Sequence, residues 1–118
     1  MIKSEALAAL SALAQETRLD AFRLLVQAGP AGLTAGDLAE RLDISPPALS
    51  FHLKGLSHAG LVRARQDGRF IHYSAAFDAM QTLVDFLSEN CCGGATCAPV
   101  RPATGRGAAT RPAMRRQS

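Results

Sequence analysis

Hydrophobic residues recur every three or four positions in the first part of the chain, and this spacing predicts amphipathic helices. Leu7, Leu10 and Leu13 mark a first helix. A second helix, which Thr17 could cap, carries hydrophobic residues on one side as far as Val26, after which a Gly-Pro pair ends it. The chain is therefore expected to begin with two helices.

Two further helices follow, and a recognisable capping sequence begins each of them. Thr34-Ala35-Gly36-Asp37 has the Ser/Thr-x-x-acid form of a helix start and leads a short third helix. After a tight turn, Ser45-Pro46 supplies a capping residue and then proline at the first helical position, which needs no N–H. The fourth helix is predicted to run to about His58. Two short helices joined in this way form a helix-turn-helix.

The hydrophobic period then changes to alternation, which predicts a β-hairpin. Alternating residues 61–65 and 70–73 flank Gln66-Asp67-Gly68-Arg69, and Asp-Gly between two such segments is a strong hairpin signal. A last helix is expected over about Ala75 to Asn90, hydrophobic on more than one stripe, so that one stripe could contact a partner. These elements predict a mainly α winged helix-turn-helix fold of about five helices plus a wing.

Composition excludes several classes of protein. A chain of 118 residues with 47% hydrophobic residues is long enough for one domain and too hydrophobic to be wholly disordered. No hydrophobic run approaches the length of a membrane span, and Glu5 and Glu16 interrupt the N-terminal stretch that could be mistaken for a signal peptide. We therefore expect a cytoplasmic protein with reduced thiols. Because only 5% of residues are aromatic, the core is thin and dimerisation is a reasonable expectation.

The fourth helix is the candidate recognition helix, because the second helix of a helix-turn-helix enters the major groove of DNA. Its outward residues include hydroxyls, an imidazole and a lysine, which suit phosphates and base edges, and the arginines of the wing suit the DNA backbone or minor groove. The candidate DNA contacts are Ser45, Pro47, Ser50, Phe51, His52, Lys54, Arg63, Arg65 and Arg69. The exposed ring of Phe51 could touch a thymine methyl or pack under the wing. An ordinary helical hairpin with a solvated face remains the alternative.

The location of the charges refines this picture, because the net charge of +3 is unevenly distributed. Residues 98–118 hold five arginines and no acid, which leaves residues 1–97 with a net charge of −2. Within that acidic part, residues 45–73 hold four basic residues and one acid. We therefore expect a DNA-binding and sensor domain at 1–97 and a flexible basic tail at 98–118. The tail is either solvated without a role or an arm that adds sequence-independent DNA affinity.

The sequence LDISPPALSFHLKGL at 42–56, followed by Ala59-Gly60-Leu61-Val62, resembles the arsenical-resistance (ArsR/SmtB) family of winged-helix repressors. Arg65-x-x-Gly68-Arg69 and Tyr73 extend the resemblance, which covers about residues 5–90 and includes Glu16-Thr17-Arg18-Leu19. Phe51 departs from the family, which commonly has a histidine there. The resemblance implies a homodimer joined through the first and last helices, and a repressor that leaves operator DNA when an inducer binds. The candidate interface residues are Leu7, Leu10, Met80, Val84 and Leu87.

All three cysteines of the chain lie just after the expected last helix, at Cys91, Cys92 and Cys97. Gly93-Gly94 permits positive φ angles and a reversal that could return Cys97 to the pair. Three thiolates suit a soft ion such as As(III) or Sb(III), which takes three ligands in a pyramid, whereas structural zinc requires four. Cd(II), Pb(II), Cu(I), a redox switch and an incidental cluster remain open as alternatives.

The resemblance sharpens the cysteine hypothesis, because both familiar metal sites of the family are missing. Members with an arsenic site on the third helix carry Leu-Cys-x-Cys-Asp-Leu, whereas the matching segment 33–38 has no cysteine. Zinc-sensing members carry histidines on the last helix, and residues 77–90 have none. The cysteines after the last helix are similar to those of members that respond to arsenite and antimonite.

The sequence therefore predicts a transcriptional repressor that As(III) or Sb(III) releases from operator DNA by binding Cys91, Cys92 and Cys97. A redox-sensing or soft-metal-sensing repressor of the same fold is the alternative, and an arsenic carrier without a DNA role is a more remote one. An enzyme is not expected, because the sequence offers no Ser/His/Asp set, no phosphate-binding loop and no paired catalytic carboxylates.

Overall fold

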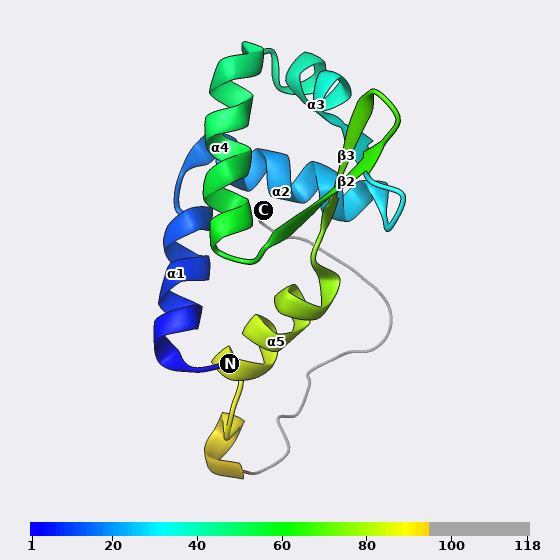
Figure 1. Ribbon diagram of the computed structural model, residues 1–118. Helices are drawn as coiled ribbons and strands as arrows, with labels where there is room; N and C mark the ends of the chain where they lie inside the picture. Colours follow the sequence, from blue (N-terminus) through cyan, green and yellow to red (C-terminus); the bar gives the residue numbers. More distant parts are fainter. Residues whose placement is uncertain (95–118) are drawn as a thin grey trace, which may run out of the picture. The chain divides into compact units, whose positions relative to one another are not determined.

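The computed structural model describes residues 1–94, of which Met1–Leu87 form one compact unit (Figure 1). The remaining described residues, Ser88 to Gly94, fall in a second unit. The elements are α1 (Lys3–Leu13), α2 (Glu16–Ala28), β1 (Leu33–Thr34), α3 (Ala35–Leu42), α4 (Pro46–His58), β2 (Val62–Asp67), β3 (Phe70–Ala75), α5 (Phe77–Leu87) and a 3₁₀ turn, η1 (Cys91–Gly94). The predicted winged helix-turn-helix with five helices is confirmed. The predicted boundary between a domain at 1–97 and a tail at 98–118 lies outside the described residues.

The helix caps agree with the sequence in two places and differ in one. The hydroxyl of Thr34 accepts a hydrogen bond from the N–H of Asp37 at 3.1 Å, and that of Ser45 accepts one from Ala48 at 3.3 Å. The prediction that Thr17 caps α2 is wrong. Gln15 precedes the helix with extended backbone, and its side-chain oxygen accepts a hydrogen bond from the N–H of Arg18 at 2.9 Å. Thr17 is already inside the first turn, where its hydroxyl is too late to cap the helix.

The wing is part of a three-stranded antiparallel sheet with the order β1-β3-β2. The strand β1, which was not predicted, pairs Leu33 with Tyr73 of β3 and so joins the wing to the start of α3. Two residues are too short to show alternation in a sequence. Gly32 precedes them with φ +74°, and a Cβ atom there would collide with the backbone carbonyl of Tyr73. Only glycine fits this approach of two backbone segments.

The hairpin and the last helix are tighter than predicted. Asp67 pairs with Phe70, so the turn consists of Gly68 and Arg69 alone. The helix α5 covers 77–87 instead of about 75–90. At its start, Ala75 is still a strand residue, paired with Val62. The elements nevertheless follow one another in the predicted order.

The core is small and built mainly from leucines and alanines. Figure 1 shows α3, the first turn of α4 and the tip of the hairpin at one end of the compact unit. The fully buried large side chains are Leu25, Leu38, Leu49, Leu56 and Leu61. Among residues 1–94, no helix combines the length and hydrophobicity that crossing a membrane requires.

Candidate functional site

The recognition helix α4 is held by one hydrophobic face and leaves the opposite face open. Leu49, Leu53 and Leu56 are buried against the core, each no more than 2% exposed. The predicted outward residues that lie exposed are Ser45, Pro47, Ser50, Phe51 and Lys54. Their contact with DNA stays a prediction, but the helix does present them together on its solvent side.

His52 differs from these residues because it is half-buried. Its Nδ1 atom is buried and has no hydrogen-bond partner among the residues that the structure describes. Its ring meets the Phe51 ring edge-on, with 5.5 Å between the centroids. Because Phe51 is 64% exposed, the alternative in which its ring packs under the wing is wrong. The ring is open to a ligand on its solvent side.

Arg18 of α2 lies beside this face, although the sequence did not identify it as a candidate DNA contact. Its guanidinium carbon is 5.6 Å from the centroid of the Phe51 ring, within the range of a cation–π contact. Arg18, Phe51, Lys54, Gly55 and His58 line a shallow hollow on the surface. The only feature of the sequence that pointed to this contact was Gly55 in the middle of α4, because glycine is unusual in a helix interior.

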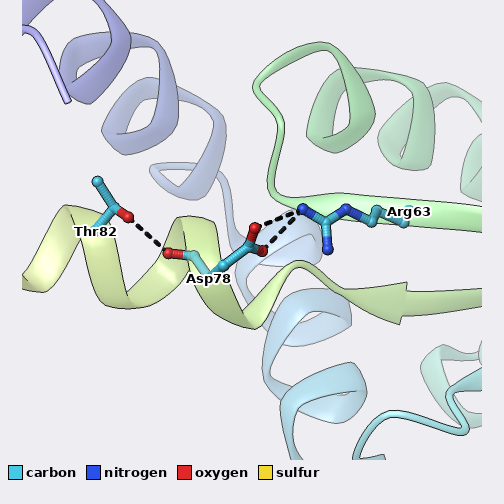
Figure 2. A network of polar contacts seen from close by, with 3 residues as sticks. All are labelled: Arg63, Asp78 and Thr82. Atoms are coloured by element: carbon cyan, nitrogen blue, oxygen red, sulfur yellow. Dashed lines mark hydrogen bonds and ion pairs between the residues drawn. The ribbon is translucent and has the colours of Figure 1, made fainter.

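The three arginines of the wing fall into two groups. Arg65 and Arg69 lie exposed on β2 and in the turn, and the structure gives neither of them an ion-pair partner within residues 1–94. Arg63 reaches the other way, to the first turn of α5, where one nitrogen donates to both carboxylate oxygens of Asp78 at 2.8 and 2.9 Å (Figure 2). That hydrogen bond lowers the pKa of the Asp78 carboxyl from its ordinary value. Arg63 therefore joins the wing to α5.

The predicted interface residues leave a hydrophobic surface on α1 and α5. The helix α1 buries Ala6, Ala9 and Ala12 and leaves Leu7 58% exposed. Leu10 of α1 and both Val84 and Leu87 of α5 are also exposed, whereas Met80 is half-buried. Their contact with a second copy stays a prediction.

The described cysteines lie in η1, in the second unit. Cys91 and Cys92 are exposed, and their sulfur atoms are 3.5 Å apart. At metal–sulfur bond lengths of about 2.3 Å, two thiolates 3.5 Å apart can bind one ion, but Cys92 would first have to be released from the disulfide that it forms in this structure. Within residues 1–94, no group of three possible metal ligands comes together. The third predicted ligand, Cys97, lies outside the described residues.

The backbone around the cysteine pair is left-handed. Gly93 and Gly94 have φ angles of +65° and +91°, as the sequence predicted, and Cys92 already has φ +59°. Cys92 is also disulfide-bonded in the structure. The segment thus combines a reversing backbone with sulfur chemistry that depends on redox state.

Comparison with known proteins identifies relatives of the compact unit. Residues 13–65 match a family model described as a helix-turn-helix domain. An ArsR-like transcriptional regulator from Rhodococcus sp. RHA1 superposes with a TM-score of 0.65 and 32% identity, over 73% of this chain and 78% of that one. The transcriptional activator HlyU of Vibrio cholerae is 30% identical over 75% of this chain and 80% of that protein. Its solved structure superposes with a TM-score of 0.60, over 78% of this chain and 99% of that one.

A curated repressor is also similar, over a shorter region. The arsenical resistance operon repressor of Escherichia coli K12 is 43% identical over 61 residues, which are 52% of this chain and 50% of that protein. This chain therefore spans about half of that repressor's length. The relatives share the helix-turn-helix and are named for different regulatory roles.

Proposed function

Because this chain belongs to the ArsR family of winged helix-turn-helix transcriptional regulators, we propose that it represses transcription as an operator-bound homodimer that As(III) or Sb(III) releases. The observation that carries the metalloid part is the pair of sulfur atoms of Cys91 and Cys92, 3.5 Å apart at a left-handed reversal of the backbone. Binding requires that the disulfide at Cys92 is reduced. The similarity to the arsenical repressor of Escherichia coli supports the same inducer class.

DNA binding rests on the exposed face of α4 and on the wing. Hydroxyls at Ser45 and Ser50 can bond phosphates or base edges, and Lys54 supplies a cation on the same face. Arg65 and Arg69 add charge on the wing, where a β-ribbon can follow the backbone or enter the minor groove. Each copy of α4 occupies one of two successive major grooves.

The homodimer rests on the leucines that α1 and α5 leave exposed. A hydrophobic surface on both terminal helices of a small domain is typical of a protein interface. A two-fold axis uses the same surface on both copies, so each exposed leucine is buried twice. The spacing of the two recognition helices then depends on how α1 and α5 pack across this interface.

The inducer acts through the chain that follows α5. Cys91 comes four residues after Leu87, the last residue of the predicted interface. Binding one ion to Cys91, Cys92 and Cys97 fixes the path of the segment between them and shifts α5 against its partner. A coupling of about 1–3 kcal/mol is typical of such linkage, which lowers DNA affinity about 5- to 150-fold.

The test is an operator-binding titration with the DNA upstream of the protein's own coding region. Arsenite, antimonite, zinc and cadmium are added in turn to wild type and to the three single Cys→Ser variants. A phosphine keeps the thiols reduced, because dithiol reductants chelate trivalent arsenic themselves. We expect arsenite and antimonite to release wild type and to have little effect on each variant. Variants that respond like wild type would refute the cysteine site.

A thiol redox switch is the second candidate, and the disulfide at Cys92 favours it. One solved structure of the relative HlyU is described as its reduced form. In this case peroxide or oxidised glutathione would release the operator without metalloid, and a phosphine would restore binding. Release by cadmium alone would instead indicate a soft-metal sensor. Arsenite binding without any operator binding would indicate a carrier.

A further inference from the structure

The recognition helix contains a glycine whose position has a structural reason. Gly55 lies in the interior of α4, where glycine is less favourable than alanine by about 1 kcal/mol. A Cβ atom at Gly55 would lie 2.9 Å from Nε and 3.1 Å from Cζ of Arg18. The missing side chain therefore makes room for the guanidinium of Arg18, which crosses from α2 onto the surface of α4.

Packing and the cation–π contact with Phe51 hold Arg18 in this position. Its Nε atom is buried and has no hydrogen-bond partner among residues 1–94, and no acid in that range forms an ion pair with the guanidinium. The Phe51 ring lies on one side of the guanidinium and the backbone at Gly55 on another. A cation placed in this way keeps its charge available for an external anion.

The neighbours of Arg18 indicate which anion this is. Arg18, Lys54 and His58 line one hollow with Phe51 and Gly55, and no acidic residue lines it. Lys54 also belongs to the exposed face of α4 that carries the predicted base contacts. An arginine fork matches the oxygens of a phosphate, and a lysine adds a second charge.

We propose that Arg18 and Lys54, with His58 beside them, bind a backbone phosphate of DNA next to the bases that the N-terminal half of α4 contacts. The proposal rests on the DNA-binding function proposed above. It adds α2 to the DNA-binding surface and gives Gly55 a role, because this glycine positions Arg18. Phe51 serves as the platform on which the guanidinium lies.

The first test is the salt dependence of DNA binding by an Arg18→Gln variant. Losing one phosphate contact reduces the slope of log affinity against log salt by about 0.9. The advantage of wild type over the variant should therefore shrink about 3.5-fold between 50 and 200 mM salt. The loss should be equal for operator and for a random duplex of the same length, because phosphate contacts carry no sequence information.

A matched control removes the same charge from another place on α2. Arg23 is exposed five residues further along α2, outside the hollow. Arg23→Gln should change the salt slope much less than Arg18→Gln. Equal changes for the two variants would mean that only net charge matters, which would overturn the proposal.

The second test uses Gly55→Ala, which displaces Arg18 without removing it. The new methyl meets the far end of a flexible side chain, and alanine favours the helix, so the melting temperature should not fall. We expect the affinity and salt slope of Gly55→Ala to resemble those of Arg18→Gln. The double variant should bind no more weakly than either single variant, since both remove one interaction.

Three results distinguish a failure of this proposal from a failure of the DNA-binding function on which it rests. If wild type binds operator and Arg18→Gln keeps its salt slope, the phosphate contact is wrong and the repressor function stands. If Gly55→Ala keeps wild-type affinity, the positioning role of Gly55 is wrong. If wild type binds no duplex at all, the DNA-binding function fails and this contact fails with it.

Discussion

The exposed leucine at position 7 gives a quantitative prediction for the proposed dimer. Leu7 lies on α1 with 58% of its surface exposed. Full burial of a leucine contributes about 1.5–3 kcal/mol, so covering this exposed part contributes about 1–1.7 kcal/mol for each copy. A two-fold interface buries the residue twice, and Leu7→Ala should therefore weaken dimerisation by about 2–3.5 kcal/mol, or about 30- to 300-fold.

The assay is sedimentation equilibrium over a range of protein concentrations, with circular dichroism to confirm the fold. Alanine is the best helix former, so α1 itself should not be weakened. Leu19→Ala is a matched control, because Leu19 is 42% exposed on α2 and lies outside the predicted interface. The control should dimerise like wild type. A Leu7→Ala dimer as tight as wild type, or an equal loss in the control, would refute the interface.

The remaining predictions concern the wing. The hydrogen bond from Arg63 lowers the pKa of the Asp78 carboxyl below the ordinary aspartate value of 3.8. The stabilisation from this ion pair is therefore fully present above pH 3.8 and is lost as the pH falls through the lowered pKa. Melting temperatures of wild type and Asp78→Asn should therefore converge in acid, and a constant difference would contradict the link. Gly32→Ala should destabilise the fold by more than about 1 kcal/mol in urea unfolding, since a Cβ atom collides with the Tyr73 carbonyl. Arg65→Ala should reduce operator affinity in gel shifts and leave arsenite uptake unchanged, and unaltered affinity would remove this residue from the DNA contacts.

Local signals in the sequence predicted most of the compact unit. Ser45-Pro46 and Thr34 predicted two helix starts, because a cap depends on residues within one turn. Thr17 failed as a cap because α2 begins at Glu16, one residue before it, where the Gln15 side chain accepts a hydrogen bond from the N–H of Arg18. The strand β1 is too short for its two residues to show any period, so only its partner β3 reveals it.

The parts of the site that the sequence did not predict depend on contacts between distant residues. Arg63 remains a predicted DNA contact, and the sequence did not indicate that its guanidinium also meets Asp78, fifteen residues further along the chain. Arg18 of α2 contacts Phe51 of α4, and the only feature of the sequence that indicated this contact was the glycine at position 55. The exposed face of α4, in contrast, follows from its buried leucines, because helical periodicity fixes both faces together.

Arsenite titration of the operator complex tests the central claim most directly. A fluorescent operator is held in complex at a protein concentration only a few times the dissociation constant, so that a moderate loss of affinity releases it. A phosphine keeps the thiols reduced, and the anisotropy is followed as arsenite is added. The account predicts that wild type is released with a break at one arsenite per protomer, and that Cys92→Ser stays bound through the same range. Wild type that binds arsenite and stays on the operator, or a Cys92→Ser variant released at the same ratio, would contradict it.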